Sequence, residues 1–418
     1  MDCLRRCLTR RHSRLAAGLA LLLVLLEGAA GVVLSSRPQL FDGLAVPSAG
    51  RRASLVGSVE RILADDPSSL ARFDPDLGWT SRAGNEDPEL SISRQGIRAQ
   101  REYSERPVEG VLRIAAFGDS FVYGSEVGVA ASWPAQMESG NADIEVLNYG
   151  VPGYGQDQIA LRLRAEAREL RPDVVLIGVA TPTIDRLMSV SVFRSPGAPF
   201  HSFVCKPRFL LDGSGDLVLL PMPFRQAGDL RALLADPESI RTLGAHDFWY
   251  EPFVYENWLF EHSRACRLLY AGWARLRQRY IDGDRPLSGP PGRGVFNRYS
   301  SGFKILMRLL EQCIRDVQAQ GALPIVLLLP DGYSVNRLLR GLPGIMDPLR
   351  DACQDQGLEL VDLAVPLLDR ARAEGAAALF IERFHYSERG NQVVAEHLLQ
   401  EAHSRGWRQL LSRAGRAE

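Results

Sequence analysis

The residues of this chain best suited to chemistry begin with Asp119 and Ser120, in the stretch "AAFGDSFVYG" at 115–124. A serine hydroxyl becomes a nucleophile when a base removes its proton, and a histidine held by a carboxylate does this near neutral pH. Ser120 follows an apolar run between Gly118 and Gly124, as expected at the carboxyl end of a strand. The same pair also fits a turn that caps a helix. The sequence alone therefore leaves two interpretations of Asp119 and Ser120 open: a helix cap, or a site in which Ser120 is a nucleophile.

The base that Ser120 needs is best matched by His385, one of seven histidines, in "FIERFHYSERGNQVVAEHLL". Glu382 lies three residues upstream, and residues three apart on one turn can face each other. Glu382 could then bind the imidazole nitrogen that does not meet the serine. The alternative is a surface histidine before a helix that is capped by Ser387. Ser120, His385 and Glu382 thus form the predicted proton-transfer chain.

Five short apolar runs predict the elements that would position these residues. Each run is nearly continuous, which is typical of strands buried on both faces of a parallel sheet. Helix-like stretches at 157–170 and 302–321 lie between them, and the second ends on Gly321. The pattern predicts a doubly wound α/β sandwich, with ligands bound outside the carboxyl ends of the strands. The predicted strands are 111–120, 144–150, 172–180, 323–332 and 358–366.

A long insertion at about 195–297 separates the third and fourth predicted strands. Its stretch "FLLDGSGDLVLLPMPF" predicts a β-hairpin around the turn at 212–216. The aromatic stretch at 248–260 fits either the core of the insertion or a platform for stacking sugars, and we favour the core. Asp362 is interpreted as a strand-end cap and not as a catalytic acid.

The N-terminus predicts a membrane anchor. Five arginines occur in residues 1–14, and an apolar run from Leu15 to Leu34 is interrupted only by Glu27. About 20 apolar residues span a bilayer, and the arginines before them would stay cytoplasmic. A cleaved signal peptide is the alternative, because "EGAAG" offers small residues to a peptidase. We favour the uncleaved anchor, since the apolar run continues past that point.

The predicted organisation is a basic tail at 1–14, an anchor at 15–34, a polar stalk at 35–108 that packs on the domain, and a catalytic domain at 109–412. Lys and Arg number 49 against 50 Asp and Glu, so the chain lacks the basic excess of a nucleic-acid-binding protein. Six cysteines show no zinc spacing, and neither a metal nor a cofactor is predicted. Cys313 and Cys353 fall in helical patterns and are interpreted as buried thiols.

Three motifs together resemble the SGNH/GDSL hydrolase family of esterases and O-acyltransferases: "FGDSFVYG", "NYGVPGYG" and "ERFHYSERGNQVVAEHL". The resemblance covers about Phe73 to His403, apart from the insertion. It implies a flavodoxin-like α/β fold, Ser120 as nucleophile, His385 as base, and Glu382 where the family usually has Asp. It also implies that the amides of Ser120 and Gly153 stabilise the oxyanion.

The sequence departs from the family at the third oxyanion donor. The family places an asparagine just after the third strand, whereas "LIGVATPTIDR" has none. The hydroxyl of Thr181 or Thr183 could take its place, or the oxyanion hole is reduced to two amides.

The predicted function is that of an exported, membrane-anchored serine esterase or O-acyltransferase. Its predicted substrate is an ester, such as an O-acetyl group, of an extracytoplasmic glycan or small molecule. A second hypothesis is a catalytically weak relative that binds glycan or assembly partners in surface-polysaccharide machinery. The missing asparagine and the aromatic insertion motivate this alternative, and we favour the enzyme.

Overall fold

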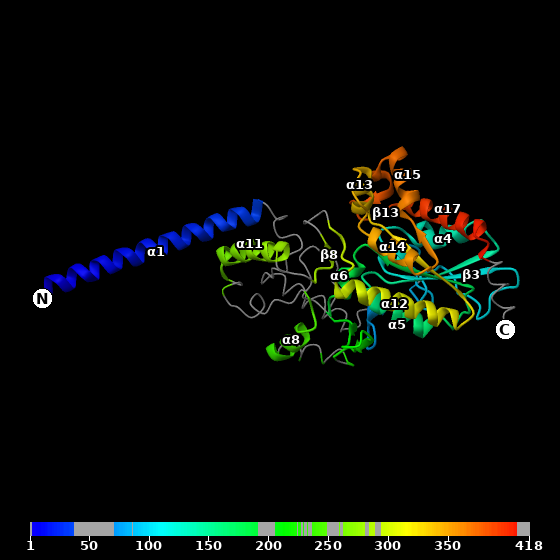
Figure 1. Ribbon diagram of the computed structural model, residues 1–418, viewed down its shortest axis with the longest axis horizontal. Coiled ribbons are helices and arrows are strands. Elements are labelled where there is room, and N and C mark those ends of the chain that lie inside the picture. Colours follow the sequence, from blue (N-terminus) through cyan, green and yellow to red (C-terminus); the bar gives the residue numbers. More distant parts are fainter. Residues whose placement is uncertain are drawn as a thin grey trace.

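The computed structural model describes residues 2–36, 71–85, 87–190, 205–223, 236–248, 262–280, 284–288 and 294–407, with single residues between 225 and 259. The first helix, α1 (Asp2–Ser36), projects from an α/β body, and part of the insertion lies between the two (Figure 1). Of the described helices, α1 contains one stretch, Arg14–Ser36, that is long and apolar enough to cross a membrane.

A five-stranded parallel sheet forms the centre of the body. Its spatial order is β11-β10-β5-β3-β4, and each neighbouring pair runs parallel. Numbered along the chain, this is the 2-1-3-4-5 order of the flavodoxin-like doubly wound fold. The predicted fold class is therefore confirmed. The strands are β3 (Leu112–Gly118), β4 (Ile144–Gly150), β5 (Val174–Ala180), β10 (Leu323–Leu329) and β11 (Leu360–Asp362).

Helices cover both faces of the sheet, and each face has its own apolar core. One core contains buried residues of α5 (Gln156–Glu166), α12 (Ser301–Gln318) and α14 (Asp347–Asp355). The other contains residues of α4 (Trp133–Glu138), α13 (Gly332–Leu339), α15 (Ala364–Glu374), α16 (Ala376–Leu379) and α17 (Glu388–Ser404). The helices predicted at 157–170 and 302–321 correspond to α5 and α12. Ser300 caps α12 by accepting from the amide of Phe303 at 3.1 Å.

The described part of the predicted stalk is folded into the body. β1 (Ala71–Asp74) and β2 (Gly78–Ser81) pair as an antiparallel hairpin. Trp79, Ile97 and Tyr103 are all buried in the core that also contains α5. The Trp79 indole donates to the carbonyl of Pro152 at 3.2 Å, so this segment contacts the loop after β4 directly.

The insertion contains the predicted hairpin, formed by β6 (Arg208–Leu211) and β7 (Leu217–Leu220). It also contains α8 (Pro237–Gly244), α11 (Arg264–Tyr280) and a short ladder between β8 (Leu287–Ser288) and β9 (Val295–Phe296). Apart from Phe248 and Leu259, the aromatic stretch lies outside the described residues. Cys313 and Cys353 are buried free thiols, as predicted.

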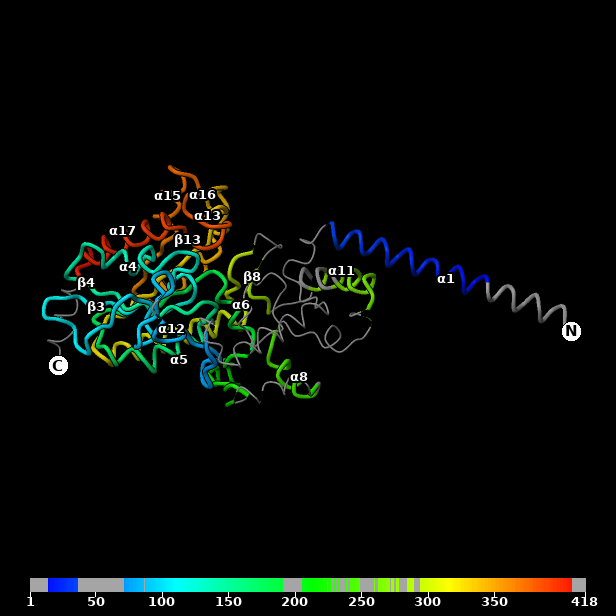
Figure 2. Tube along the Cα trace, turned by 180° about the vertical axis from the view of Figure 1, so that it is seen from behind, coloured from blue at the N-terminus to red at the C-terminus, as the bar shows by residue number. Residues whose placement is uncertain are grey.

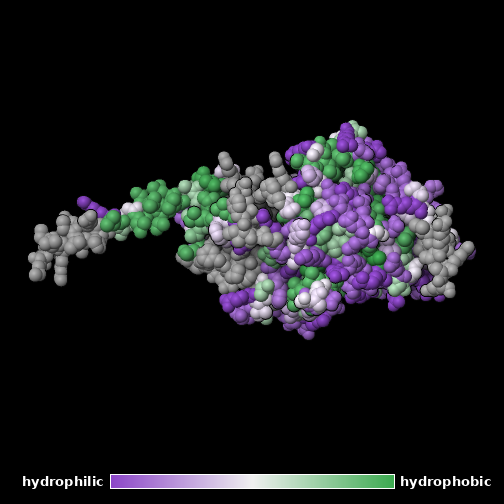
Figure 3. All heavy atoms as spheres, in the orientation of Figure 1, coloured by the Kyte–Doolittle hydropathy of each residue, from purple (hydrophilic) through white to green (hydrophobic). Residues whose placement is uncertain are grey.

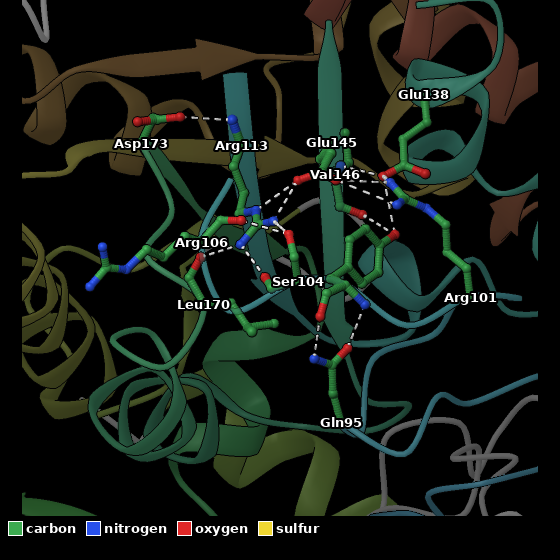
Figure 4. Close-up of polar contacts among 11 residues, drawn as sticks. Gln95, Arg101, Ser104, Arg106, Arg113, Glu138, Glu145, Val146, Leu170 and Asp173 are labelled. Atoms are coloured by element: carbon green, nitrogen blue, oxygen red, sulfur yellow. Dashed lines mark hydrogen bonds and ion pairs between the residues drawn. The ribbon is translucent and has the colours of Figure 1, made fainter. Parts of the chain in front are cut away.

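A buried ion pair joins β3 and β4 at the amino end of the sheet (Figure 4). The Arg113 side chain is fully buried, and its Nε donates to Glu145 Oε2 at 2.8 Å. Its Nη1 donates to the carbonyls of Ser104 and Leu170, so the pair also fastens the loops before β3 and after α5. This cluster stabilises the end of the sheet opposite to Ser120.

Replacing Arg113 with Met should lower the free energy of unfolding by about 3–5 kcal/mol, because Glu145 loses the buried partner of its charge. Urea denaturation of the purified protein measures this. Arg164→Met is the matched control, since Arg164 pairs with Asp316 at the surface and exposed pairs contribute about 1 kcal/mol or less. Equal losses in both variants would contradict the structural role assigned to Arg113.

Candidate active site

The turn that carries Ser120 joins β3 to the short helix α3 (Ser120–Tyr123). Asp119 caps α3, because its Oδ1 accepts from the amide of Phe121 at 3.0 Å. A side chain at Gly118 would place its Cβ 2.2 Å from Val122, and Gly124 ends the helix with a left-handed φ of +78°. The two interpretations of this dipeptide are compatible: Asp119 is the cap, and its neighbour Ser120 presents the hydroxyl.

The structure brings Ser120 and His385 together. His385 Nε2 lies 2.9 Å from Ser120 Oγ, and both side chains are buried. His385 begins β13 (His385–Tyr386), which pairs with β12 (Phe380–Ile381). The rings of Phe121 and Phe384 lie 5.0 and 4.5 Å from the imidazole, centroid to centroid. The ring is therefore held by packing as well as by its hydrogen bonds.

The carboxylate beside the imidazole comes from Glu126 and not from Glu382. Glu126 Oε1 lies 2.7 Å from His385 Nδ1, the nitrogen that Glu382 was expected to bind. Glu382 is exposed at the turn between β12 and β13, where Glu382 and Arg383 both have left-handed backbones, with φ of +48° and +63°. The expectation was wrong because these residues form a hairpin. Ile381 pairs across it with His385, and the helical spacing of three does not apply.

Glu126 lies in a tight loop six residues after Ser120. It has φ +71°, which is unfavourable for a residue other than glycine and persists only where the surroundings fix it. Arg98 supplies that support from the N-terminal segment. Its guanidinium donates to the carbonyls of Gly124 and Val127, each at 2.6 Å, and lies 3.9 Å from the centroid of the Tyr123 ring.

The sequence offered one signal for Glu126. It is the first acidic residue after Ser120, in a glycine-bounded loop that directly follows the nucleophile motif. Its side chain is 43% exposed and lines a cavity of about 570 Å³, together with Glu89, Val127 and Ile381. The acid thus contacts solvent on one side and the buried imidazole on the other.

Gly153 lies in the turn that follows β4. The amide of Tyr154 donates to the carbonyl of Val151 at 3.2 Å, and Gly153 has φ +85° behind Pro152, which describes a type II turn. In the part of the chain that the structure describes, the Gly153 amide donates no hydrogen bond. The turn leaves that amide available to a ligand at the edge of the sheet where Ser120 lies.

Thr181 and Thr183 differ in how their hydroxyls are used. The amide of Asp331 donates to Thr181 Oγ1 at 3.3 Å, and Ser334 Oγ, 3.1 Å from that oxygen, donates its own proton to Asp331. The Thr181 proton is therefore directed to Ser334. Thr183 opens α6 (Thr183–Leu187), and its hydroxyl is buried with no partner among the described residues. Within the described parts of the chain, Thr183 is therefore the threonine whose hydroxyl proton has no acceptor.

Arg186 connects the turn that carries Ser120 to the turn that carries Gly153. Its Nη1 donates to the carboxylate of Asp119 and, at 2.9 Å, to the carbonyl of Tyr154. Both the arginine and the aspartate are buried. One guanidinium thus holds the two loops that carry the proposed oxyanion amides, and the sequence pattern did not single it out.

Asp362 ends β11 and accepts from the amide of Ala364 at 2.9 Å. Its role as a strand-end cap is confirmed. Among the described residues, no group of three or more His, Cys, Asp or Glu side chains is placed to hold a metal ion.

No protein-family model and no curated protein matches the sequence. Among solved structures, the chain is similar to a G-D-S-L family lipolytic protein from Desulfitobacterium hafniense. The identity is 14% and the TM-score 0.32, over 68% of this chain and 97% of that one. A lipase/acylhydrolase from Enterococcus faecalis shares 13% identity, with a TM-score of 0.34 over 71% and 97% of the two chains. The acetyl xylan esterase AlAXEase shares 11%, with a TM-score of 0.34 over 69% and 99%.

The printed name of the first of these neighbours contains G-D-S-L, the motif after which the family that the three sequence motifs resemble is named. Identities of 14% or less and TM-scores near 0.3 carry no argument about activity. The assignment of the site therefore depends on the order of the strands and on the contacts between Ser120, His385 and Glu126.

Asp331 gives the site region a measurable dependence on pH. It caps α13, beside the loop that carries His385, and burial raises its pKa to about 6. A carboxyl group that binds its proton more tightly in the folded state stabilises the fold in acid. That contribution is lost as the pH rises through the folded pKa.

We therefore expect the unfolding free energy of the wild type, relative to Asp331→Asn, to fall by about 3 kcal/mol between about pH 4 and pH 7. The asparagine oxygen can still accept from the amide of Ser334, so the cap is retained. Urea denaturation at a series of pH values measures the difference. If the unfolding free energies of the two proteins instead change with pH in parallel, the pKa of Asp331 is the same in the folded and unfolded states and the prediction is wrong.

Proposed function

We propose that this protein is a serine hydrolase or acyltransferase of the SGNH type that acts on esters. The observation that carries the proposal is the hydrogen-bonded series from Ser120 Oγ through His385 to Glu126, with contacts of 2.9 and 2.7 Å. Two parts of the chain far apart in sequence, the loop that carries Ser120 and Glu126 and the hairpin that carries His385, supply these groups at one edge of a parallel sheet.

In the proposed mechanism, Ser120 Oγ attacks the acyl carbonyl and its proton passes to His385 Nε2. The carboxylate of Glu126 accepts a hydrogen bond from the Nδ1–H group of His385. This bond orients the imidazole ring and stabilises the imidazolium that forms. The amides of Ser120 and Gly153 donate to the developing oxyanion, and the Thr183 hydroxyl supplies the donor that the family takes from asparagine. His385 then protonates the leaving alcohol. Water or an acceptor hydroxyl releases the acyl group from Ser120.

The substrate and its location form the second part of the proposal. The apolar part of α1, which follows five arginines at the start of the same helix, supports an anchored domain outside the cytoplasm. An O-acyl ester of an extracytoplasmic glycan suits that location. The printed name of one neighbour, an acetyl xylan esterase, concerns a substrate of this chemical class.

The first test is the hydrolysis of p-nitrophenyl acetate by the purified full chain. Ser120→Ala should lower kcat by a factor of about 10³ or more, because the nucleophile is lost. Ser214→Ala, at the exposed turn of the β6–β7 hairpin, is the matched serine control and should leave the rate unchanged. No turnover by the wild type, with glycan binding that survives Ser120→Ala, would favour the alternative of a glycan-binding assembly component.

The second test compares the two candidate acids. Glu126→Gln should lower kcat by about 10²–10⁴, since an amide no longer stabilises the imidazolium and can select the wrong tautomer. Glu382→Gln should leave kcat within about twofold, because surface substitutions away from the site have small effects. If the Glu382 variant loses activity while the Glu126 variant keeps it, the assignment of Glu126 as the acid that orients His385 is wrong.

A further inference from the structure

The described part of α11 exposes an apolar face. Leu269, Trp273 and Leu276 are 74%, 53% and 55% exposed, and their spacing places them on one side of the helix. The sequence of α11, "RACRLLYAGWARLRQRY", also contains five arginines and no acidic residue. Exposed apolar side chains in such a helix indicate a surface that binds a membrane or another protein. The arginines in its sequence favour a negatively charged binding partner.

The position of α11 next to α1 favours a membrane as the binding partner of this surface. The two helices lie side by side in both views of the molecule (Figures 1 and 2). Ala30 and Gly31 of α1 are buried, whereas residues 14–26 are exposed. The contact with α11 therefore lies in the outer part of the apolar run, from Glu27 onward. Hydrophobic side chains continue from α1 to the adjoining surface of the insertion (Figure 3).

Glu27 fixes the depth of α11 along α1. Its carboxylate accepts from the Ser263 hydroxyl and from the amides of Arg264 and Ala265, the latter two at 2.7 and 3.3 Å. The one acidic residue in the apolar run is thus the N-terminal cap of a helix in the insertion. Donors satisfy the charge, which removes much of the cost of placing a carboxylate within a membrane segment.

The distances along the helices agree with the dimensions of a bilayer. Glu27 lies seven residues before Leu34, the end of the apolar run, which is about 10 Å of helix. Trp273 is nine residues beyond Arg264, about 13 Å further out, and this places it near the level where the apolar run ends. Tryptophan is enriched at that level of a membrane.

We propose that α11 is a second membrane contact, with its first turns beside α1 in the outer interface of the bilayer and its exposed apolar side chains, Leu269, Trp273 and Leu276, against the lipid. This goes beyond the esterase function and rests on α1 being a membrane anchor. It also implies that α1 is retained and not cleaved, because cleavage near Gly31 would remove the carboxylate that caps α11.

The test is the quenching of tryptophan fluorescence in the full chain, reconstituted into phosphatidylcholine and phosphatidylglycerol vesicles with brominated acyl chains. The wild type should lose a fraction of its emission that Trp273→Phe does not lose. Trp79→Phe is the control, because Trp79 is only 2% exposed and lies in the α/β body. The emission of this variant should be quenched to the same extent as that of the wild type. Equal quenching in the wild type and Trp273→Phe would overturn the proposal.

Carbonate extraction of the same vesicles distinguishes the failure of the anchor from the failure of the α11 contact. Release of the protein would show that α1 is not an anchor. Retention without quenching of Trp273 would show that α11 alone is misplaced, and cross-links between copies through α11 would then identify the face as a self-interface. Hydrolysis of a soluble ester by Trp273→Phe should match the wild type, so this result is separate from the test of catalysis.

Discussion

The hydrogen bond between Ser120 and His385 is the contact on which the account depends, because it joins positions 265 residues apart in the sequence. It forms only if β3 and the β12–β13 hairpin present their loops at the same edge of the sheet. The 2-1-3-4-5 strand order achieves this, since the carboxyl ends of parallel strands all face one side. The covered core on each face then fixes the loops relative to one another.

Two buried arginines give the site its rigidity. Arg98 binds the carbonyls of the loop that carries Glu126, and Arg186 joins Asp119 to the turn that carries Gly153. Each guanidinium offers several donors in a fixed plane, so one side chain can hold two segments of backbone. Positioning therefore comes from elements outside the catalytic motifs, one in the N-terminal segment and one in α6. These contacts allow Glu126 to hold its position beside His385 although its backbone has a left-handed φ.

Much of the fold could be predicted from the sequence because its signals are local. The five apolar runs predicted the strands of the sheet, and the "DGSGD" turn predicted the β6–β7 hairpin. Ser120 and His385 stand out because few residue types perform their chemistry. The acid was assigned to Glu382 on helical spacing, whereas left-handed residues at 382 and 383 turn the chain into a hairpin. Glu126 reaches the imidazole through a contact over 259 residues, so a search for acidic residues close to His385 in the sequence misses it.

The central claim is that Ser120 carries the acyl group during turnover. Its most direct test is acid quenching of the reaction with p-nitrophenyl acetate in the first turnover, followed by peptide mass spectrometry. The account predicts an acetyl group on the peptide that contains Ser120, formed more slowly when Glu126 is replaced by Gln. An acetyl group found only on another residue, or turnover with no acyl-protein, would contradict it.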